Sequence, residues 1–120
     1  MGKGNNPIVE KSFEFALSVM AYCDLLEENK KYVIARQILK AGTSIGANIR
    51  EAQSAESLTD FIHKLKIAAK EADETEYWLL LCDCAINYPD PKHLQENLKE
   101  IQKLLSAIIS KSKDKLNHQT

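Results

Sequence analysis

Three histidines are the residues of this chain that most readily suggest metal chemistry. His63, His93 and His118 lie far apart, and no two of them have the four-residue spacing that places two imidazoles on one helix face. Metal sites inside helical bundles pair glutamates with Glu-x-x-His motifs on facing helices, and the sequence contains no such motif. Glu71 and Glu74 therefore lack histidine partners, and we predict no metal site.

Three cysteines are the candidate nucleophiles. Cys23, Cys82 and Cys84 are odd in number, form no Cys-x-x-Cys pair and fall on or beside apolar helix faces. A thiol buried in such a place is inert, so we expect all three to be core residues in a reducing compartment. No glycine-rich phosphate loop follows a strand. The sequence predicts a protein that is not an enzyme and takes no cofactor and no small-molecule substrate.

Four amphipathic patterns position these residues. Apolar residues at steps of three and four predict helices at roughly 7–28, 31–54, 57–87 and 91–114. Asn6 before Pro7, and Ser57, could cap two of these helices. The prolines of Asn87-Tyr-Pro-Asp-Pro must end the third, and we expect the fourth to fray from Lys111. With 120 residues in one domain, the pattern predicts an all-α, antiparallel up-down-up-down four-helix bundle.

The third predicted helix has apolar residues on two sides. Opposite its core stripe lie Ile67, Tyr77, Trp78 and Leu81. A bundle helix needs one stripe, and a helix that is apolar on two sides is usually covered on both. We expect another copy of the chain to cover these four residues as a subunit interface, since Trp and Tyr are enriched in contact surfaces. The alternative is that Trp78 simply lies against the surface.

The second predicted helix contains two glycines and a strip of polar residues. Gly42 and Gly46 are one turn apart, and each costs about 0.5 to 1 kcal/mol relative to alanine, so we expect them to allow another helix to pack closely. The polar strip beside the apolar face consists of Gln37, Ser44, Asn48 and Glu51. We expect hydrogen-bond partners for it on the third helix, with Glu71 or Glu74 joining through a lysine. The alternative is a solvated face.

These segments resemble the four-helix-bundle family, also called the 23S rRNA intervening-sequence protein family. The resemblance rests on Arg36-Gln37 and on three longer segments: Gly-Thr-Ser-Ile-Gly-Ala-Asn-Ile-Arg-Glu-Ala at 42–52, Ser-Leu-Thr-Asp-Phe-Ile-His-Lys-Leu-Lys-Ile-Ala at 57–68 and Lys-Glu-Ala-Asp-Glu-Thr-Glu-Tyr-Trp-Leu at 70–79. It implies a four-helix subunit that assembles into a ring-shaped homopentamer. The family name refers to a genomic location inside 23S rRNA genes and not to an activity, and the resemblance brings no catalytic residue.

Nucleic-acid binding is the second function that the resemblance suggests. A relative, the accessory variability determinant of diversity-generating retroelements, is basic and binds nucleic acid and a reverse transcriptase, whereas this chain has a net charge of -1. The candidate nucleic-acid contacts are five lysines near the end of the chain: Lys99, Lys103, Lys111, Lys113 and Lys115. A ring of copies would repeat this patch around its axis. The alternative is that these lysines complement the helix dipole and keep the surface soluble.

The sequence therefore predicts a homo-oligomeric, pentameric scaffold or adaptor of unknown cellular role. Its expected partners are other copies of itself and a nucleic acid or another protein. The alternative is a nucleic-acid-binding accessory protein. No stretch approaches the roughly 18 apolar residues of a membrane span, and the first residues lack the apolar region of a signal peptide, so we expect no membrane partner and a cytoplasmic location.

Overall fold

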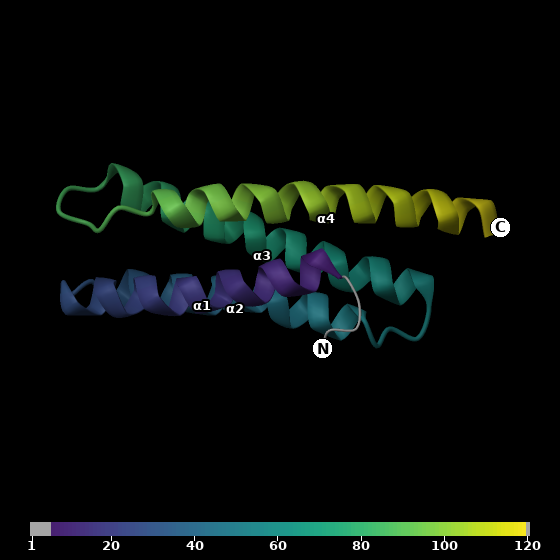
Figure 1. The fold of residues 1–120 in the computed structure, drawn as a ribbon, viewed down its shortest axis with the longest axis horizontal. Helices are drawn as coiled ribbons and strands as arrows, with labels where there is room; N and C mark the ends of the chain where they lie inside the picture. Colours follow the sequence, from purple (N-terminus) through teal and green to yellow (C-terminus); the bar gives the residue numbers. More distant parts are fainter. Residues whose placement is uncertain (1–5, 120) are drawn as a thin grey trace.

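The computed structural model describes residues 6–119, which form four α-helices and no strand. The helices are α1 (Pro7–Glu28), α2 (Tyr32–Ala52), α3 (Leu58–Cys84) and α4 (Lys92–Gln119). Successive helices run in opposite directions, and each contacts the helices before and after it, with α4 also contacting α1 (Figure 1). The predicted all-α four-helix fold is confirmed. In this arrangement α1 and α3 lie at opposite corners of the bundle.

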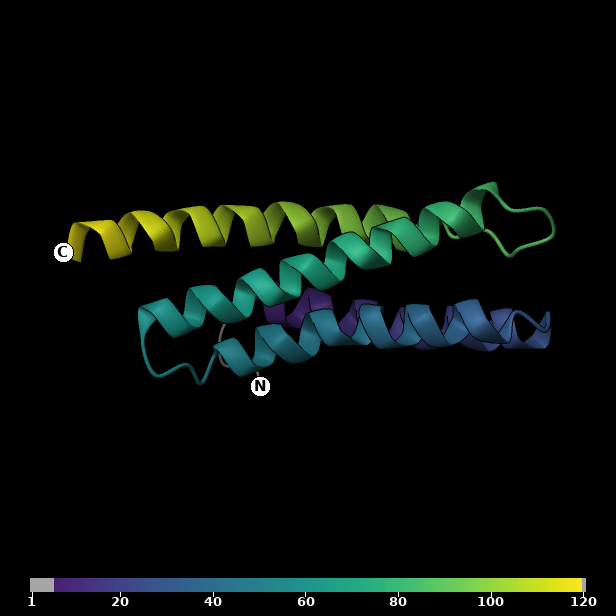
Figure 2. The ribbon, with the colours of Figure 1, turned by 180° about the vertical axis from the view of Figure 1, so that it is seen from behind.

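The bundle can be described as two layers, α1 with α2 and α3 with α4. Helices α1 and α4 are nearer the viewer in Figure 1, whereas α2 and α3 are nearer from behind in Figure 2. Large apolar side chains from all four helices fill the space between the layers, among them Phe15, Ile45, Leu79 and Leu98. Each such side chain stabilises the fold by about 1.5–3 kcal/mol when fully buried. One chain thus closes a complete core.

Capping differs between the two helices for which a cap was predicted. At the start of α3 the Ser57 hydroxyl accepts a hydrogen bond from the Asp60 backbone N–H at 3.0 Å, and the Asp60 carboxylate accepts one from the Glu56 N–H at 3.2 Å. The first bond satisfies the free amide of Asp60 in the first turn, and the second satisfies the amide of Glu56 just before the helix. The predicted side-chain cap by Asn6 is wrong, because its amide instead donates to Gln53 Oε1 at 3.1 Å, joining the start of α1 to the end of α2.

Helix α3 ends at Cys84, three residues before the predicted end at 87. Ala85 has extended backbone angles (φ -79°, ψ 145°), although its N–H still donates to the Leu81 carbonyl at 2.9 Å. Asn87 has a φ of 64°, in the left-handed region that asparagine tolerates better than most residues. The chain therefore leaves the helix before it reaches Pro89.

Helix α4 continues to Gln119, so the expectation that it frays from Lys111 is wrong. Ser112 is buried and Leu116 is half-buried. Both follow Ile108 at steps of four residues, which keeps the packed face of α4 in register for another two turns. The end of α4 extends well past the start of α1 and the end of α2, so this end of the bundle consists mainly of α3 and α4 (Figure 1).

The two glycines of α2 face α1. A methyl group at Gly42 would lie 2.9 Å from both terminal carbons of Val19, and one at Gly46 would lie 3.2 Å from the backbone oxygen of Ser12. The first distance is shorter than atoms in packed proteins approach one another, so Gly42 permits the observed separation of α1 and α2. The helix that packs closely against both glycines is α1, along one continuous strip.

We expect Gly42→Ala to lower the free energy of unfolding by about 1–2 kcal/mol. The new methyl group overpacks the core against Val19, which outweighs alanine's gain of roughly 1 kcal/mol in helix propensity. In a Val19→Ala background, where the opposing carbons are absent, the same change should be neutral or stabilising. Urea unfolding of the wild type, Gly42→Ala, Val19→Ala and the double variant completes this double-mutant cycle. A stabilising Gly42→Ala in the presence of Val19 would contradict the contact.

Candidate functional site

An exposed apolar strip runs along α1 on the side opposite the core. Phe13, Leu17 and Met20 are 53%, 51% and 50% exposed. They recur at steps of four and three, so they lie on one side of α1, whereas Phe15 and Val19 on its other side are buried. Antiparallel pairing places Leu39 of α2, which is 40% exposed, beside Met20. We call Phe13, Leu17, Met20 and Leu39 the α1–α2 face.

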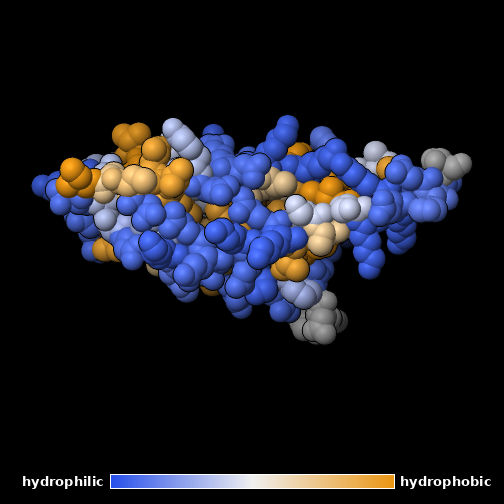
Figure 3. Space-filling view, turned by 90° about the horizontal axis from the view of Figure 1, so that it is seen from above, coloured by the Kyte–Doolittle hydropathy of each residue, from blue (hydrophilic) through white to orange (hydrophobic). Residues whose placement is uncertain are grey.

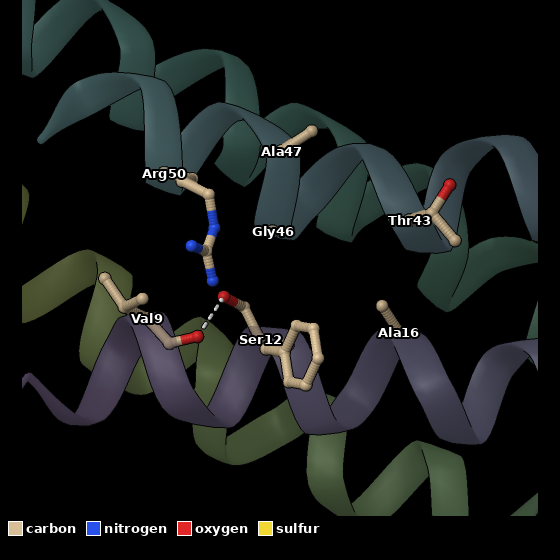
Figure 4. A pocket seen from close by; sticks show the side chains of 8 residues that line it. Val9, Ser12, Ala16, Thr43, Gly46, Ala47 and Arg50 are labelled. Atoms are coloured by element: carbon tan, nitrogen blue, oxygen red, sulfur yellow. Dashed lines mark hydrogen bonds between the residues drawn. The ribbon is translucent and has the colours of Figure 1, made fainter. Parts of the chain in front are cut away.

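A shallow hollow of about 150 Å³ lies beside this strip, where Gly46 and other small residues bring α1 and α2 together. Arg50 reaches from α2 toward α1 and closes one end of the hollow (Figure 4). Its guanidinium carbon lies 6.0 Å from the centre of the Phe13 ring. Within residues 6–119 this guanidinium forms no ion pair, so its charge is available to a partner. The Ser12 hydroxyl beside it donates to the Val9 carbonyl at 3.2 Å.

The structure divides the four predicted interface residues of α3 into two pairs. Tyr77 and Leu81 are exposed, but Trp78 and Ile67 are half-buried. Trp78 packs against the subunit's own core, and its indole N–H donates to the Glu74 carboxylate at 3.1 Å. The rings of Tyr77 and Trp78 still lie near each other, with their centroids 5.6 Å apart. A subunit contact through these four residues stays a prediction, in which Tyr77 and Leu81 offer more exposed surface than Trp78 and Ile67.

Leu80 completes the exposed apolar surface of α3. It is 51% exposed and, like Tyr77, faces the side of α3 that borders α4. We call Tyr77, Leu80 and Leu81 the α3 patch. Viewed from the α3–α4 side, hydrophobic residues gather toward the end of the molecule where α3 connects to α4 (Figure 3). Because α1 and α3 occupy opposite corners, the α3 patch and the α1–α2 face point in roughly opposite directions.

A groove of about 630 Å³ runs between α3 and α4 beside the α3 patch. Its apolar lining comes from Tyr77, Leu80 and Leu98, and the Gln102 amide bridges two carboxylates at its side. That amide donates to one Asp73 oxygen at 3.3 Å and to one Glu76 oxygen at 3.2 Å. In all, four carboxylates and two lysines line the groove, which gives it two excess negative charges: Asp73, Glu76, Asp83, Glu96, Lys92 and Lys99.

The predicted polar network between α2 and α3 is largely absent. Ser44 donates to the Lys40 carbonyl at 2.7 Å and Asn48 to the Ser44 carbonyl at 2.8 Å, so both bonds stay within α2. Short polar side chains in a helix often bond to the carbonyl four residues earlier, and Ser44 and Asn48 form these bonds within α2 in place of bonds to α3. Glu51 alone reaches α3, through an ion pair with Lys64 at 3.1 Å.

The remaining members of the predicted network do not join it. In the part of the chain described, neither Gln37 nor the Glu71 carboxylate forms a side-chain hydrogen bond to another member, and the Glu71 backbone carbonyl accepts from Thr75. Glu74 binds the Trp78 indole, as described above. These carboxylates therefore lie along α3 as separate negative charges.

All five candidate nucleic-acid contacts on α4 are exposed: Lys99, Lys103, Lys111, Lys113 and Lys115. Over residues 6–119, none of the five takes part in an ion pair. They do not form one stripe. An α-helix turns by about 100° per residue, which places Lys99, Lys103 and Lys113 on one side of α4 and Lys111 and Lys115 on another. Helix α4 carries six lysines against three carboxylates, whereas α3 carries three lysines against six carboxylates. The molecule is thus electrically polarised across its α3–α4 layer.

Tyr22 and two thiols form a buried cluster near the two helix connections at one end of the bundle. The Tyr22 hydroxyl donates to the Pro89 carbonyl at 2.7 Å, and the Cys23 thiol donates to the Ala35 carbonyl at 3.3 Å. Burial raises the pKa of Cys23 to about 12, and it also raises the pKa of Tyr22 and of Cys82. The expectation that all three cysteines are buried is wrong for Cys84, which is exposed because α3 turns it away from the core.

The histidines lie on different parts of the bundle, His63 on α3 and His93 and His118 at opposite ends of α4. Among residues 6–119, no three histidine, cysteine, aspartate or glutamate side chains gather closely enough to hold a metal ion. None of the four helices, over the part described, has the length and apolar character needed to cross a membrane.

The sequence reasoning missed the α1–α2 face. Its signal was present in the recurrence of Phe13, Leu17 and Met20 at helical spacing, on the side of α1 opposite Phe15 and Val19. Only α3 is predicted to be apolar on two sides, although α1 shows the same pattern. Leu39 could not be assigned to this face from the sequence, because its position beside Met20 depends on how α1 and α2 pair.

Comparison with known proteins places the chain beside one family. The family model described as 23S rRNA-intervening sequence protein matches residues 4–110. Among solved structures, the chain is similar to a protein of unknown function from the S23 ribosomal protein family of Bacteroides thetaiotaomicron VPI-5482. The two are 48% identical with a TM-score of 0.79, over 85% of this chain and 97% of that one. No curated protein matches the chain.

We expect the fold to lose stability above about pH 9, in part through Cys23. Below that pH the Cys23 thiol is protonated in the folded and in the unfolded chain, so its contribution to the free energy of unfolding is fully present. Above it the unfolded thiol ionises at its ordinary pKa near 9, whereas the folded thiol, with a pKa of about 12, does not. The free energy of unfolding should then fall by up to about 1.4 kcal/mol per pH unit.

Urea unfolding under reducing conditions at pH 8 and pH 10 measures this loss. Cys23→Ala should make the loss smaller, whereas Cys84→Ala, which removes an exposed thiol, should leave it unchanged. An equal loss in the wild type and in Cys23→Ala would contradict the assignment.

Proposed function

Because the chain belongs to the 23S rRNA-intervening sequence protein family, we propose that it is a non-enzymatic protein that assembles with copies of itself into a pentamer. The assembly serves as a scaffold or adaptor that binds other macromolecules. The observation that carries this proposal is the pair of exposed apolar surfaces, the α1–α2 face and the α3 patch, on opposite sides of one bundle. The seven large apolar side chains of these two surfaces are each between 39% and 56% exposed.

Closure of the core within one chain supports this proposal. The buried residues of α1, α2, α3 and α4 form one apolar cluster, so the subunit needs no partner to bury its own stripes. The exposed apolar residues are therefore surplus to folding. Removing apolar area from water stabilises an association by roughly 25 cal/mol per Å², which favours a contact that covers both surfaces. Contiguous exposed apolar patches on a folded protein commonly mark such contacts.

The expected mass of the wild-type protein in light scattering is a fixed multiple of 13.5 kDa that does not change on dilution through the micromolar range. Leu17→Asp and Leu81→Asp should each shift this mass to that of a monomer, because a carboxylate replaces an exposed apolar contact. Circular dichroism should show unchanged helix content, since both side chains lie outside the core.

A matched control adds the same charge elsewhere. Ser106→Asp lies at an exposed position of α4 outside both apolar surfaces and should leave the mass unchanged. Trp78→Ala should behave differently again, lowering the thermal unfolding midpoint because Trp78 packs against the core. A wild-type protein that remains a monomer at every concentration would end the proposal.

Nucleic-acid binding is the second candidate function, and one observation favours it. The five exposed lysines of α4 form no ion pairs in residues 6–119, so their charges are available to phosphates. In a pentamer this set would occur five times, and the summed field of the copies could hold a nucleic-acid backbone that one subunit could not. The net charge of -1 weighs against binding by a single subunit.

If this second function holds, labelled RNA or DNA should bind at low ionic strength with an affinity that falls steeply as salt is added. The triple change Lys111→Glu, Lys113→Glu and Lys115→Glu should abolish binding and leave the oligomer mass unchanged. A matched charge control makes three charge reversals elsewhere, Lys30→Glu, Lys31→Glu and Lys40→Glu, and should have a smaller effect. Fluorescence anisotropy of the labelled nucleic acid measures the affinity and its salt dependence, and light scattering measures the oligomer mass. The absence of binding even in low salt would exclude this candidate.

A further inference from the structure

We propose that the groove between α3 and α4 binds a basic amphipathic helix of another protein, with a cationic side chain of that helix held between the Asp73 and Glu76 carboxylates. This inference rests on the adaptor role proposed above and names the kind of partner that the adaptor takes.

Two carboxylates at one end of the groove lack a cationic partner. Asp73 and Glu76 each accept a hydrogen bond from the side-chain nitrogen of Gln102, at 3.3 Å and 3.2 Å. Over residues 6–119 neither carboxylate takes part in an ion pair. A neutral amide therefore bridges two like charges, and a cation placed between them would be stabilised by both.

The charges along the rest of the groove are balanced. Asp83 pairs with Lys92 at 4.0 Å, next to the connection between α3 and α4. Glu96 and Lys99 carry opposite charges, and both belong to α4. The two excess negative charges of the groove are therefore those at the Gln102 bridge, which fixes the place of a partner's cation.

The groove also has the length and the apolar surface that a helix requires. Its α3 wall runs from Asp73 to Asp83, which is roughly 15 Å or three helical turns. Leu98 is buried at its base, and Tyr77 and Leu80 are half-exposed along its side. An amphipathic helix binds such a groove with its apolar residues against the base and its charged residues at the rim.

Three helices of the chain itself lack an exposed face of this kind. Helix α1 has exposed apolar side chains but carries five carboxylates against one lysine, and α3 carries six carboxylates against three lysines. Helix α4 is basic, but over Lys92–Gln119 none of its large apolar side chains is exposed. None of the three therefore matches the groove in both charge and apolar surface.

Helix α2 is basic and has exposed apolar residues, but they are arranged in the reverse order. Arg36 and Lys40 each lie about 200° of helix rotation from the buried Ile38, so these cations occupy the middle of the outer face of α2. Tyr32 and Leu39 lie to one side of them, toward α1. Seating α2 of a second copy in the groove would press its cations against the apolar base. The groove therefore suits a helix of a different protein.

One subunit has room for this partner and for a contact with another copy. Around α3, Trp78 and Leu81 lie on the side of Tyr77 that faces α2, whereas Asp73 and Leu80 lie on the side that faces α4. A copy that contacts α3 through Trp78 and Leu81 leaves the carboxylates of the groove in water. The groove remains open to a partner in the assembly.

A peptide-binding experiment tests this inference. The probe is a fluorescein-labelled peptide of about four helical turns, with leucines along one helix face and arginines on either side of them. Fluorescence anisotropy should show saturable binding to the wild-type protein. A peptide of the same composition with its leucines scattered around the helix, and one with glutamates in place of the arginines, should each bind about tenfold more weakly or worse.

Variants of the acidic pair locate the binding site. The double change Asp73→Asn and Glu76→Gln removes both charges with little change in shape, and it should weaken peptide binding by about tenfold or more. Gln102→Lys places a cation of the chain's own at the two carboxylates and should weaken binding similarly, with unchanged helix content in circular dichroism. The matched control, Glu27→Gln with Glu28→Gln, removes two exposed carboxylates outside the groove and should leave the affinity unchanged.

The outcomes separate this inference from the proposed function. A wild-type protein that does not bind the arginine peptide, or a control that weakens binding as much as the acidic-pair variant, would overturn the inference and leave self-assembly intact. Light scattering detects a second copy as the occupant: an assembly that the change at Asp73 and Glu76 converts to monomers would also overturn it. A monomeric wild type that binds the peptide as described would contradict self-assembly alone.

Discussion

The close approach of α1 to α2 is the constraint on which the rest of the molecule depends. Gly46 lies against the backbone of Ser12, and at Gly42 the Val19 side chain of α1 fills the space so closely that even a methyl group would require it to move. This closeness fixes the rotation of α1 about its own axis. As a result, Phe15 and Val19 point into the core while Phe13, Leu17 and Met20 point outward as one strip.

Much of the fold could be predicted from the sequence because its signals are local. The start of α1 at Pro7 and the Ser57 cap of α3 depend on residues within a few positions of each other. The end of α3 was placed three residues too late because prolines show where a helix must have ended, and not where Asn87 turns the chain. The predicted end of α4 is too early because the lysines from Lys111 onward suggest a fully exposed, frayed segment, although Ser112 and Leu116 among them pack against the bundle.

The candidate surfaces were harder to predict because they depend on contacts between helices. Trp78 is predicted to lie at an interface from its position opposite the core stripe of α3 and from its residue type. The structure adds that it also packs against its own core and that its N–H donates to Glu74. The strip on α1 has a sequence period, but only the fold shows that it faces away from α3. The α3–α4 groove combines residues from two helices, such as Asp73 and Gln102, whose proximity no single periodicity reveals.

The bonding of the short polar side chains on α2 bears on how that helix could meet a neighbour. The side chains of Thr43, Ser44 and Asn48 each donate to the carbonyl four residues earlier, at 2.6 to 2.8 Å. A donor that already has an internal acceptor does not lose a bond when water leaves, so its desolvation is far cheaper than that of an unsatisfied group. Helix α2 therefore carries polar residues that water can hydrate in a single chain. Their desolvation costs little free energy when another surface displaces that water.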